Sequence, residues 1–182
     1  MHIFLTGEIQ VGKSTIIRNF LAQSGLSADG FMTYWETDRG GGRNLYLSPY
    51  SLAPQIHDRR LIVHDNGGHR HHRLSLTAGA VEAFDIYGAA ILNDSGKRSA
   101  VIMDELGVME SKSPAFQRAV MRHIYGNVTV LGVIKPVNNE FLNTIRSHEN
   151  VAVHEVTPEN RDSVLKWLMR VPAHNWQAAG RY

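Results

Sequence analysis

Residues 7–14 read GEIQVGKS, and this stretch decides the fold. It fits the pattern G-x-x-x-x-G-K-[ST], in which a glycine-rich turn joins a β-strand to an α-helix. The residues before it, His2–Thr6, form a short apolar run that predicts a strand, and Lys13–Gln23 carries apolar residues at the spacing of one helical face. The pattern therefore indicates a phosphate-binding loop between the first strand and the first helix.

The residues of this loop have expected roles at a nucleotide. The glycines allow the backbone to curl so that N–H groups point at phosphate oxygens, and the helix N-terminus favours negative charge there. Lys13 is expected to neutralise the β- and γ-phosphates, Ser14 to complete the coordination shell of Mg²⁺, and Thr15 to lie near the α-phosphate. The predicted nucleotide-binding residues are Gly7, Glu8, Ile9, Gln10, Val11, Gly12, Lys13, Ser14 and Thr15.

A second stretch with chemistry is the apolar run Ala100–Met103, which ends in Asp104 and Glu105. Ligands of open α/β sheets bind at the C-terminal ends of the strands, so both carboxylates are expected at the phosphate end. Asp104 is predicted to hold the Mg²⁺ shell through a water molecule, and Glu105 to orient and polarise the attacking water. Guanine selectivity is not predicted, because a later strand ends in Lys135–Asn138 rather than in an Asn-Lys-x-Asp segment.

Size and composition are those of one globular domain: 182 residues, of which 43% are hydrophobic and 20% charged. A net charge of +2 with scattered basic residues predicts no nucleic-acid partner, and a chain without cysteine has no disulfide or thiolate metal site. No run approaches the roughly 20 apolar residues that span a bilayer, and the N-terminus lacks a signal-peptide pattern. A cytoplasmic protein without membrane contacts is predicted, and its protein partners are not readable.

The alternation of β-rich runs with helical segments predicts a three-layer α/β P-loop NTPase domain. Its central sheet is expected to be five-stranded and mostly parallel, with an antiparallel hairpin, Phe31–Thr37 and Arg43–Tyr50, at its edge. Residues 1–171 are expected to form the single domain, and 172–182 a loosely held tail. Further helices are expected at 77–92, 114–124, 140–148 and 158–169, with Thr77, Ser113 and Thr157 as N-caps.

The sequence resembles the small cancer-related nucleoside-triphosphatase family of P-loop proteins. The likeness is carried by the glycine loop, Met103–Glu110, Gly30–Thr33 with Arg43, and Val156–Asp162. It implies hydrolysis of ATP, GTP or another nucleoside triphosphate with little base selectivity. Together with the loop and the acid pair, it predicts a Mg²⁺-dependent phosphoanhydride hydrolase.

Arginines that could balance the charge developing on the γ-phosphate are Arg39, Arg43, Arg146 and Arg161. Arg43 is the predicted catalytic arginine, beside Lys13 and Glu105. The segment His69–Arg73 holds three histidines, and imidazole suits Zn²⁺, but no Cys or Glu stands at ligand spacing. A solvated loop, or a lid closed by Arg70 or Arg73, is the preferred interpretation.

Two alternatives stay open at this point. A small-molecule or nucleoside kinase on the same fold would replace water by an acceptor hydroxyl, with residues 66–73 as a lid. A non-catalytic nucleotide sensor would bind NTP without turnover, because Glu8 places a carboxylate beside the phosphates and repels them. Release of phosphate without an added acceptor separates hydrolysis from both.

Overall fold

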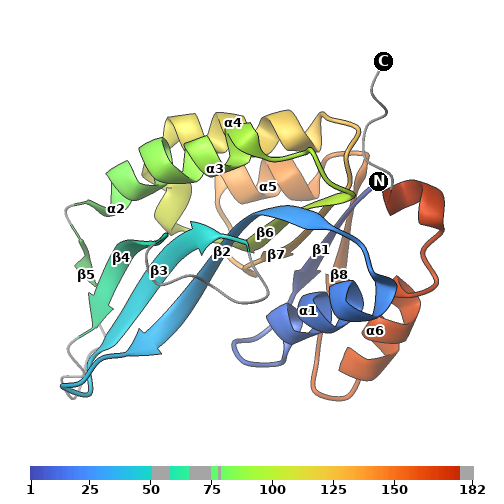
Figure 1. Ribbon diagram of the computed structural model, residues 1–182, viewed down its shortest axis with the longest axis horizontal. Helices are drawn as coiled ribbons and strands as arrows, with labels where there is room; N and C mark the ends of the chain where they lie inside the picture. Colours follow the sequence, from blue (N-terminus) through green and yellow to red (C-terminus); the bar gives the residue numbers. More distant parts are fainter. Residues whose placement is uncertain (51–57, 66–74, 78, 177–182) are drawn as a thin grey trace.

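A mixed eight-stranded sheet organises the computed structural model, which describes residues 1–50, 58–65, 75–77 and 79–176 (Figure 1). The strands are β1 (His2–Thr6), β2 (Ala28–Thr37), β3 (Arg43–Pro49), β4 (Arg60–Asp65), β5 (Ser75–Leu76), β6 (Ala100–Leu106), β7 (Val130–Ile134) and β8 (Val151–Glu155). Their order is β5-β4-β3-β2-β6-β7-β1-β8. The five strands from β2 to β8 in this order are parallel, and β2 to β5 pair antiparallel. The predicted α/β fold with a mostly parallel sheet and an antiparallel edge is confirmed.

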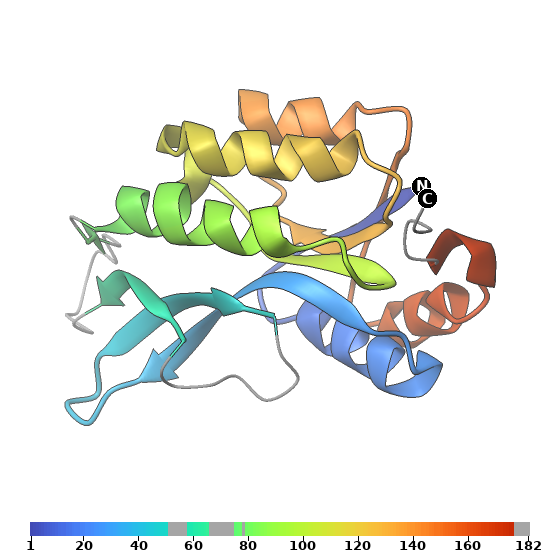
Figure 2. The same cartoon turned by 45° about the horizontal axis from the view of Figure 1, so that its top comes forward.

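Helices cover both faces of the sheet and complete three layers (Figures 1 and 2). They are α1 (Lys13–Ser24), α2 (Ala80–Glu82), α3 (Ala89–Asp94), α4 (Pro114–Ile124), α5 (Glu140–Arg146) and α6 (Arg161–Leu168), and a π-helical turn (Ala83–Gly88) joins α2 to α3. Helices α2 to α5 lie on one face, and α1 and α6 on the other. Each face has its own apolar core, one around Phe31, Phe84 and Phe116 and one around Phe20 and Trp176.

The strand order places three chain segments side by side at the C-terminal ends of the parallel strands. Strand β7 lies between β1, which leads into the glycine loop, and β6, which leads into the acid pair. Neighbouring strands are about 4.8 Å apart, so the loop and the acids start about 10 Å from each other. The residue that follows β7, Lys135, emerges between them.

The predicted N-caps have different outcomes: Thr77 is wrong, whereas Ser113 is the N-cap residue of α4 with Pro114 first in the helix, but its side chain makes no capping hydrogen bond. The helix expected at Thr77 begins at Ala80, and the Thr77 hydroxyl donates to the Ile62 carbonyl of β4 at 3.0 Å. Helix α4 does begin after residue 113, but its first free N–H groups donate to the Asp85 carboxylate, with 2.8 Å from the Ala115 nitrogen. A carboxylate from a neighbouring helix therefore replaces the expected serine cap.

The C-terminal part also differs from expectation. Helix α6 begins at Arg161 rather than at residue 158, because the Asn160 side chain accepts the Thr157 N–H at 2.8 Å and closes a turn first. Residues Ala173–Trp176 form a 3₁₀ turn, and the Trp176 ring packs against Phe20 with centroids 4.9 Å apart. The packed chain thus reaches Trp176, beyond the boundary expected at residue 171.

Candidate active site

Backbone geometry fixes the glycine loop. Gly12 has a φ of 100° and stands just before α1, and Gly7 has a φ of 129° at the end of β1. Both values lie in the left-handed region that side chains disfavour. A Cβ atom on Gly7 would lie 2.3 Å from the carbonyl oxygen of Val156, so the loop also needs glycine for its contact with the chain after β8.

Lys13 lies beneath this loop with its ammonium group held by the backbone. Its side chain is 8% exposed, and Nζ donates to the carbonyl oxygens of Gly7 at 2.9 Å and Glu8 at 2.5 Å. Burial lowers the pKa of Lys13, and the charges of Glu105 and Asp104 oppose that change. The cation is therefore positioned between the loop and the acid pair.

A cavity of about 680 Å³ opens over the loop. Of the predicted nucleotide-binding residues, six line it: Ile9, Gln10, Gly12, Lys13, Ser14 and Thr15. Gly7 is buried under the loop, Val11 packs into the apolar core, and the Glu8 side chain is exposed to solvent. Repulsion of phosphate by Glu8 is expected only if its carboxylate faces the loop; the side chain is exposed instead, and the Glu8 carbonyl group accepts a hydrogen bond from Lys13.

Ser14 and Asp104 are brought together from two elements, α1 and β6. The Ser14 hydroxyl donates to Oδ1 of Asp104 at 3.0 Å, although the residues are 90 positions apart. Asp104 is 5% exposed, and this burial raises its pKa to about 6, while the bond from Ser14 acts in the opposite direction. A hydroxyl and a carboxylate oxygen side by side are the donor types that Mg²⁺ takes from proteins, so the pair fits this metal.

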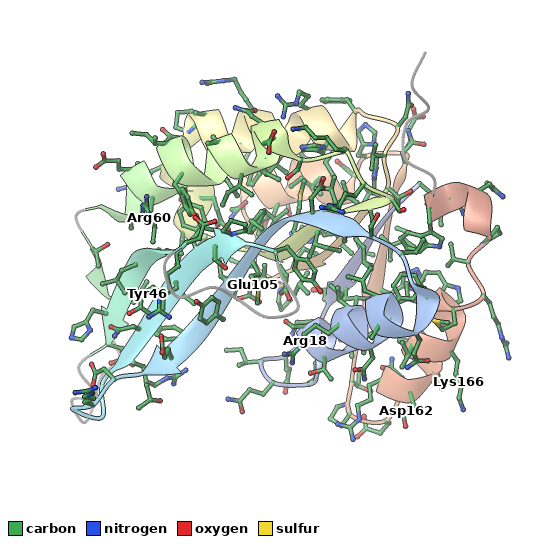
Figure 3. The ribbon with its side chains drawn as sticks, viewed as in Figure 1. Arg18, Tyr46, Arg60, Glu105, Asp162 and Lys166 are labelled. Carbon is green, nitrogen blue, oxygen red and sulfur yellow. The ribbon has the colours of Figure 1, made fainter. Side chains whose placement is uncertain are left out.

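Glu105 forms an ion pair that the sequence analysis did not anticipate. Its Oε1 lies 2.7 Å from Nζ of Lys135, and its backbone N–H donates to Thr33 Oγ1 at 3.3 Å. Both charged side chains are about one-third exposed and line the cavity. The sequence signal that could have found Lys135 is its position directly after β7, whose five residues are all buried. In Figure 3, Glu105 is drawn between the β2–β3 hairpin and α1.

A second buried carboxylate, Glu110, supports the turn after β6. Its two carboxylate oxygens accept the Gly107 N–H at 3.1 Å each, and the residue is 2% exposed. Burial raises the pKa of Glu110 to about 7, the bond from Gly107 and the charge of Lys135 lower it, and the charge of Glu105 raises it further. Glu110 thus holds the turn that directly follows the strand carrying Glu105, without lining the cavity.

Arg43 is the one of the four candidate arginines that the structure places at the cavity. It lies on β3 with its guanidinium carbon 4.6 Å from the ring centroid of Trp35. Arg39 lies exposed in the turn of the hairpin, and Arg161 is exposed at the start of α6. Arg146 donates to backbone carbonyl groups of the segment between β7 and α5, where it holds the chain that follows Lys135.

The histidine segment His69–Arg73 lies outside the described residues. Within residues 1–50, 58–65, 75–77 and 79–176, no group of three or more His, Cys, Asp or Glu side chains is arranged to hold a metal ion. The same part of the chain contains no helix that combines the length and the apolar character needed to cross a membrane.

The chain matches a known protein family. The model of a family described as NTPase matches residues 2–169 of the chain. The chain belongs to this NTPase family. The resemblance seen in the sequence, and the prediction of a nucleoside-triphosphatase, are thereby confirmed.

Relatives of known name agree with this assignment. The chain is 33% identical to the cancer-related nucleoside-triphosphatase homolog of Bos taurus and 32% identical to the human protein, each over 90% of this chain and 92% of the relative. It is 30% identical to the nucleoside-triphosphatase THEP1 of Methanothermobacter thermautotrophicus, over 90% of this chain and 91% of that protein.

Solved structures of the family share the fold. The crystal structure of THEP1 from Aquifex aeolicus superposes with a TM-score of 0.66 at 25% identity, covering 92% of this chain and 96% of that one. The solution structure of a human cancer-related nucleoside triphosphatase gives 0.64 at 28% identity, with 92% and 94% covered.

Proposed function

We propose that this NTPase family member hydrolyses nucleoside triphosphates in a Mg²⁺-dependent reaction with little base selectivity. The observation that carries the proposal is the Ser14–Asp104 hydrogen bond at 3.0 Å, with Glu105 next to it, over a glycine loop at a helix N-terminus. These groups supply, within one cavity, phosphate binding, oxygen ligands for a cation and a carboxylate for water.

Ser14 and Asp104 are the residues that would hold Mg²⁺, Asp104 through a water molecule. Bound there, the ion would neutralise charge on the β- and γ-phosphate oxygens. The burial of Asp104 serves this role, because a carboxylate that is poorly solvated gains more from a nearby cation than an exposed one does. Ser14 keeps the Asp104 carboxylate oriented toward the loop.

The chain's own groups account for the chemical step. Glu105 orients a water molecule whose oxygen attacks the γ-phosphorus, while the bond from that phosphorus to the β–γ bridging oxygen breaks. The diphosphate leaves with the electron pair, and the proton of the water passes to the Glu105 carboxylate. Lys13 and Lys135 are proposed to offset the charge on the transferred phosphoryl group, with Arg43 as a further contributor from the hairpin.

Two cations of this proposal, Lys135 and Arg43, lie outside the glycine loop. Of these, Lys135 is proposed to contribute more to stabilising the charge on the phosphoryl group. It lies within ion-pair distance of Glu105, whereas Arg43 rests on Trp35 at the far wall of the cavity. All of these roles concern phosphate groups and water rather than the base, which supports low base selectivity. A cytoplasmic location and the lack of nucleic-acid or membrane partners stay predictions from the sequence.

Phosphate release from ATP, GTP, CTP and UTP tests the proposal, each with Mg²⁺ and with EDTA. We expect turnover of all four at rates within about tenfold of one another, and none with EDTA. Tight NTP binding without turnover would instead favour the nucleotide-sensor alternative. Turnover that survives EDTA would remove the metal role assigned to Ser14 and Asp104.

A further inference from the structure

The cavity continues past the acid pair to a wall of different chemistry. On the loop side it is lined by Lys13, Ser14 and Asp104, whereas its far wall is formed by Trp35, Leu45 and other side chains of the hairpin. Hydrolysis requires room for one water molecule next to the γ-phosphate. This side carries the exposed ring of Trp35 together with Arg43 and Asp65, which is more than that step needs, and an aromatic side chain with a few polar groups is found in sites for small organic ligands.

The spacing along β2 places this wall one small-molecule length from the reacting atoms. Thr33 accepts the Glu105 N–H and so marks the position of the acid pair on the strand. Trp35 follows two residues later, and both side chains line the cavity, so they share a face of the strand. Two residues of a β-strand span about 7 Å, which is comparable to the ribose that separates a nucleobase from its 5′-hydroxyl.

Two planar groups are layered on the far wall. The Arg43 guanidinium lies 4.6 Å from the Trp35 ring centroid, and Trp35 is 38% exposed. Leu45, which is paired with Trp35 across the hairpin, supplies aliphatic surface beside them. Indole rings and guanidinium planes both stack on nucleobases, and stacking tolerates any base.

Glu105 limits the chemistry of possible acceptors. Its carboxylate, paired with Lys135 at 2.7 Å, can take the proton from a neutral hydroxyl, as it does from water in the proposed hydrolysis. We propose that the hairpin wall is an acceptor subsite for nucleosides, with the base against Trp35 and Arg43 and the 5′-hydroxyl at Glu105. This inference rests on the proposed phosphate site but adds a phosphoryl transfer to hydrolysis.

The transfer balances without any further reactant. The 5′-oxygen forms a bond to the γ-phosphorus, and the bond from that phosphorus to the β–γ bridging oxygen breaks, so the nucleoside diphosphate leaves with the electron pair. The hydroxyl proton passes to the Glu105 carboxylate and then to solvent. The products are a nucleoside diphosphate and a nucleoside 5′-monophosphate.

The experiment follows the label from γ-³²P-ATP and γ-³²P-GTP with adenosine, guanosine, cytidine, uridine or thymidine present. The readout is the ratio of labelled nucleoside monophosphate to labelled phosphate, which does not depend on how much enzyme is folded or active. We expect transfer to at least one nucleoside in the wild type. Trp35→Leu should raise the nucleoside KM about 5- to 150-fold, the range for one stacked base, while the matched Trp35→Phe variant keeps most of the transfer.

The outcomes separate this inference from the proposed function. Phosphate release without any transfer would overturn the acceptor subsite and leave hydrolysis standing. Transfer without phosphate release would support the subsite and contradict hydrolysis as the main reaction. In a parallel assay with nucleoside monophosphates as acceptors, preferred transfer to them over nucleosides would overturn the assignment of the 5′-hydroxyl as acceptor. An NTP dissociation constant that rises in Trp35→Leu would assign the stacking surface to the base of the NTP and also overturn the inference.

Discussion

The two walls of the cavity are built in different ways. On the loop wall, backbone conformation and buried contacts set every position: Gly7 meets Val156, Gly12 turns into α1, and Lys13 is buried against carbonyl groups. On the hairpin wall, exposed side chains such as Trp35 and Arg43 supply the surface. In the proposed mechanism, phosphate binding therefore depends on the backbone of the loop, whereas what approaches the γ-phosphate depends on replaceable side chains.

Loss of the positive charge of Lys13 on the loop wall should have the largest effect on NTP binding and turnover. Lys13→Ala is expected to lower NTP affinity about 10- to 100-fold and turnover about 10³-fold, because a buried, preorganised positive charge is lost at the phosphates. Calorimetric binding and phosphate release measure the two. Lys166→Ala, at an exposed position on α6, is the matched control. A Lys13→Ala protein with wild-type affinity would contradict the role of Lys13 in binding the phosphates.

The two cations outside the loop are expected to differ. Lys135→Met keeps the aliphatic chain but loses the ammonium group at Glu105, so kcat should fall about 10²-fold. Arg43→Leu should lower kcat less than about tenfold, because Arg43 lies on the hairpin wall. Steady-state kinetics of both variants, at matched circular dichroism, give the ranking. The reverse order would move the main charge-stabilising role to the hairpin.

The raised pKa of Asp104, about 6, predicts a pH-dependent metal requirement. Below that pH the carboxyl group is protonated and a cation must displace the proton, so the half-saturating Mg²⁺ concentration should rise up to about tenfold per pH unit. The measurement is a Mg²⁺ titration of activity at pH 5, 6 and 7. Asp104→Asn is the control. The NTP still titrates in this variant, but the contribution of the Asp104 carboxyl group to the pH dependence of the half-saturating Mg²⁺ concentration should be lost. An identical pH dependence in both proteins would contradict the assignment.

The smallest effect concerns stability and Glu110. Its folded-state pKa is raised to about 7, so it contributes stability that is complete below about pH 4.5 and lost as the pH rises through 7. Glu110→Gln should therefore gain on the order of 2 kcal/mol of unfolding free energy relative to wild type between pH 5 and pH 8, measured in urea. His2, whose pKa is lowered to about 4, acts with the opposite sign in this pH range. The comparison at equal pH cancels it, and no pH dependence of the difference would contradict the burial argument.

The sequence predicted the glycine loop and Arg43 on the hairpin, but not the tertiary contacts of Glu105, for a physical reason. Gly7 to Thr15 is a local pattern in which neighbours along the chain build the site, and it was predicted residue by residue. Lys135 was not predicted: its position after a buried strand is a signal, but its place beside Glu105 depends on β7 lying between β1 and β6, which is a property of the folded sheet. The hydrogen bond from the Glu105 N–H to Thr33, over 72 residues, likewise depends on the pairing of β2 with β6.

The helix caps teach the same lesson. Thr77 and Ser113 have the right residue type for an N-cap. In the folded chain, however, the Ile62 carbonyl accepts the Thr77 hydroxyl, and the Asp85 carboxylate accepts a free N–H group of α4 that the Ser113 side chain was expected to bind. The alternation of strands and helices, by contrast, follows from apolar spacing, which long-range contacts reinforce. Fold class and loop were therefore readable, and the tertiary partners of the site were not.

The central claim is that Glu105 activates the attacking water, and Glu105→Gln tests it most directly. The variant keeps the size of the side chain and the backbone hydrogen bond to Thr33 but removes the charge that pairs with Lys135. Equilibrium binding of Mg-ATP and single-turnover hydrolysis are measured on the same preparation. We predict binding within a few-fold of wild type and hydrolysis slower by about 10²–10⁴-fold. Hydrolysis at the wild-type rate would contradict the account at its central step.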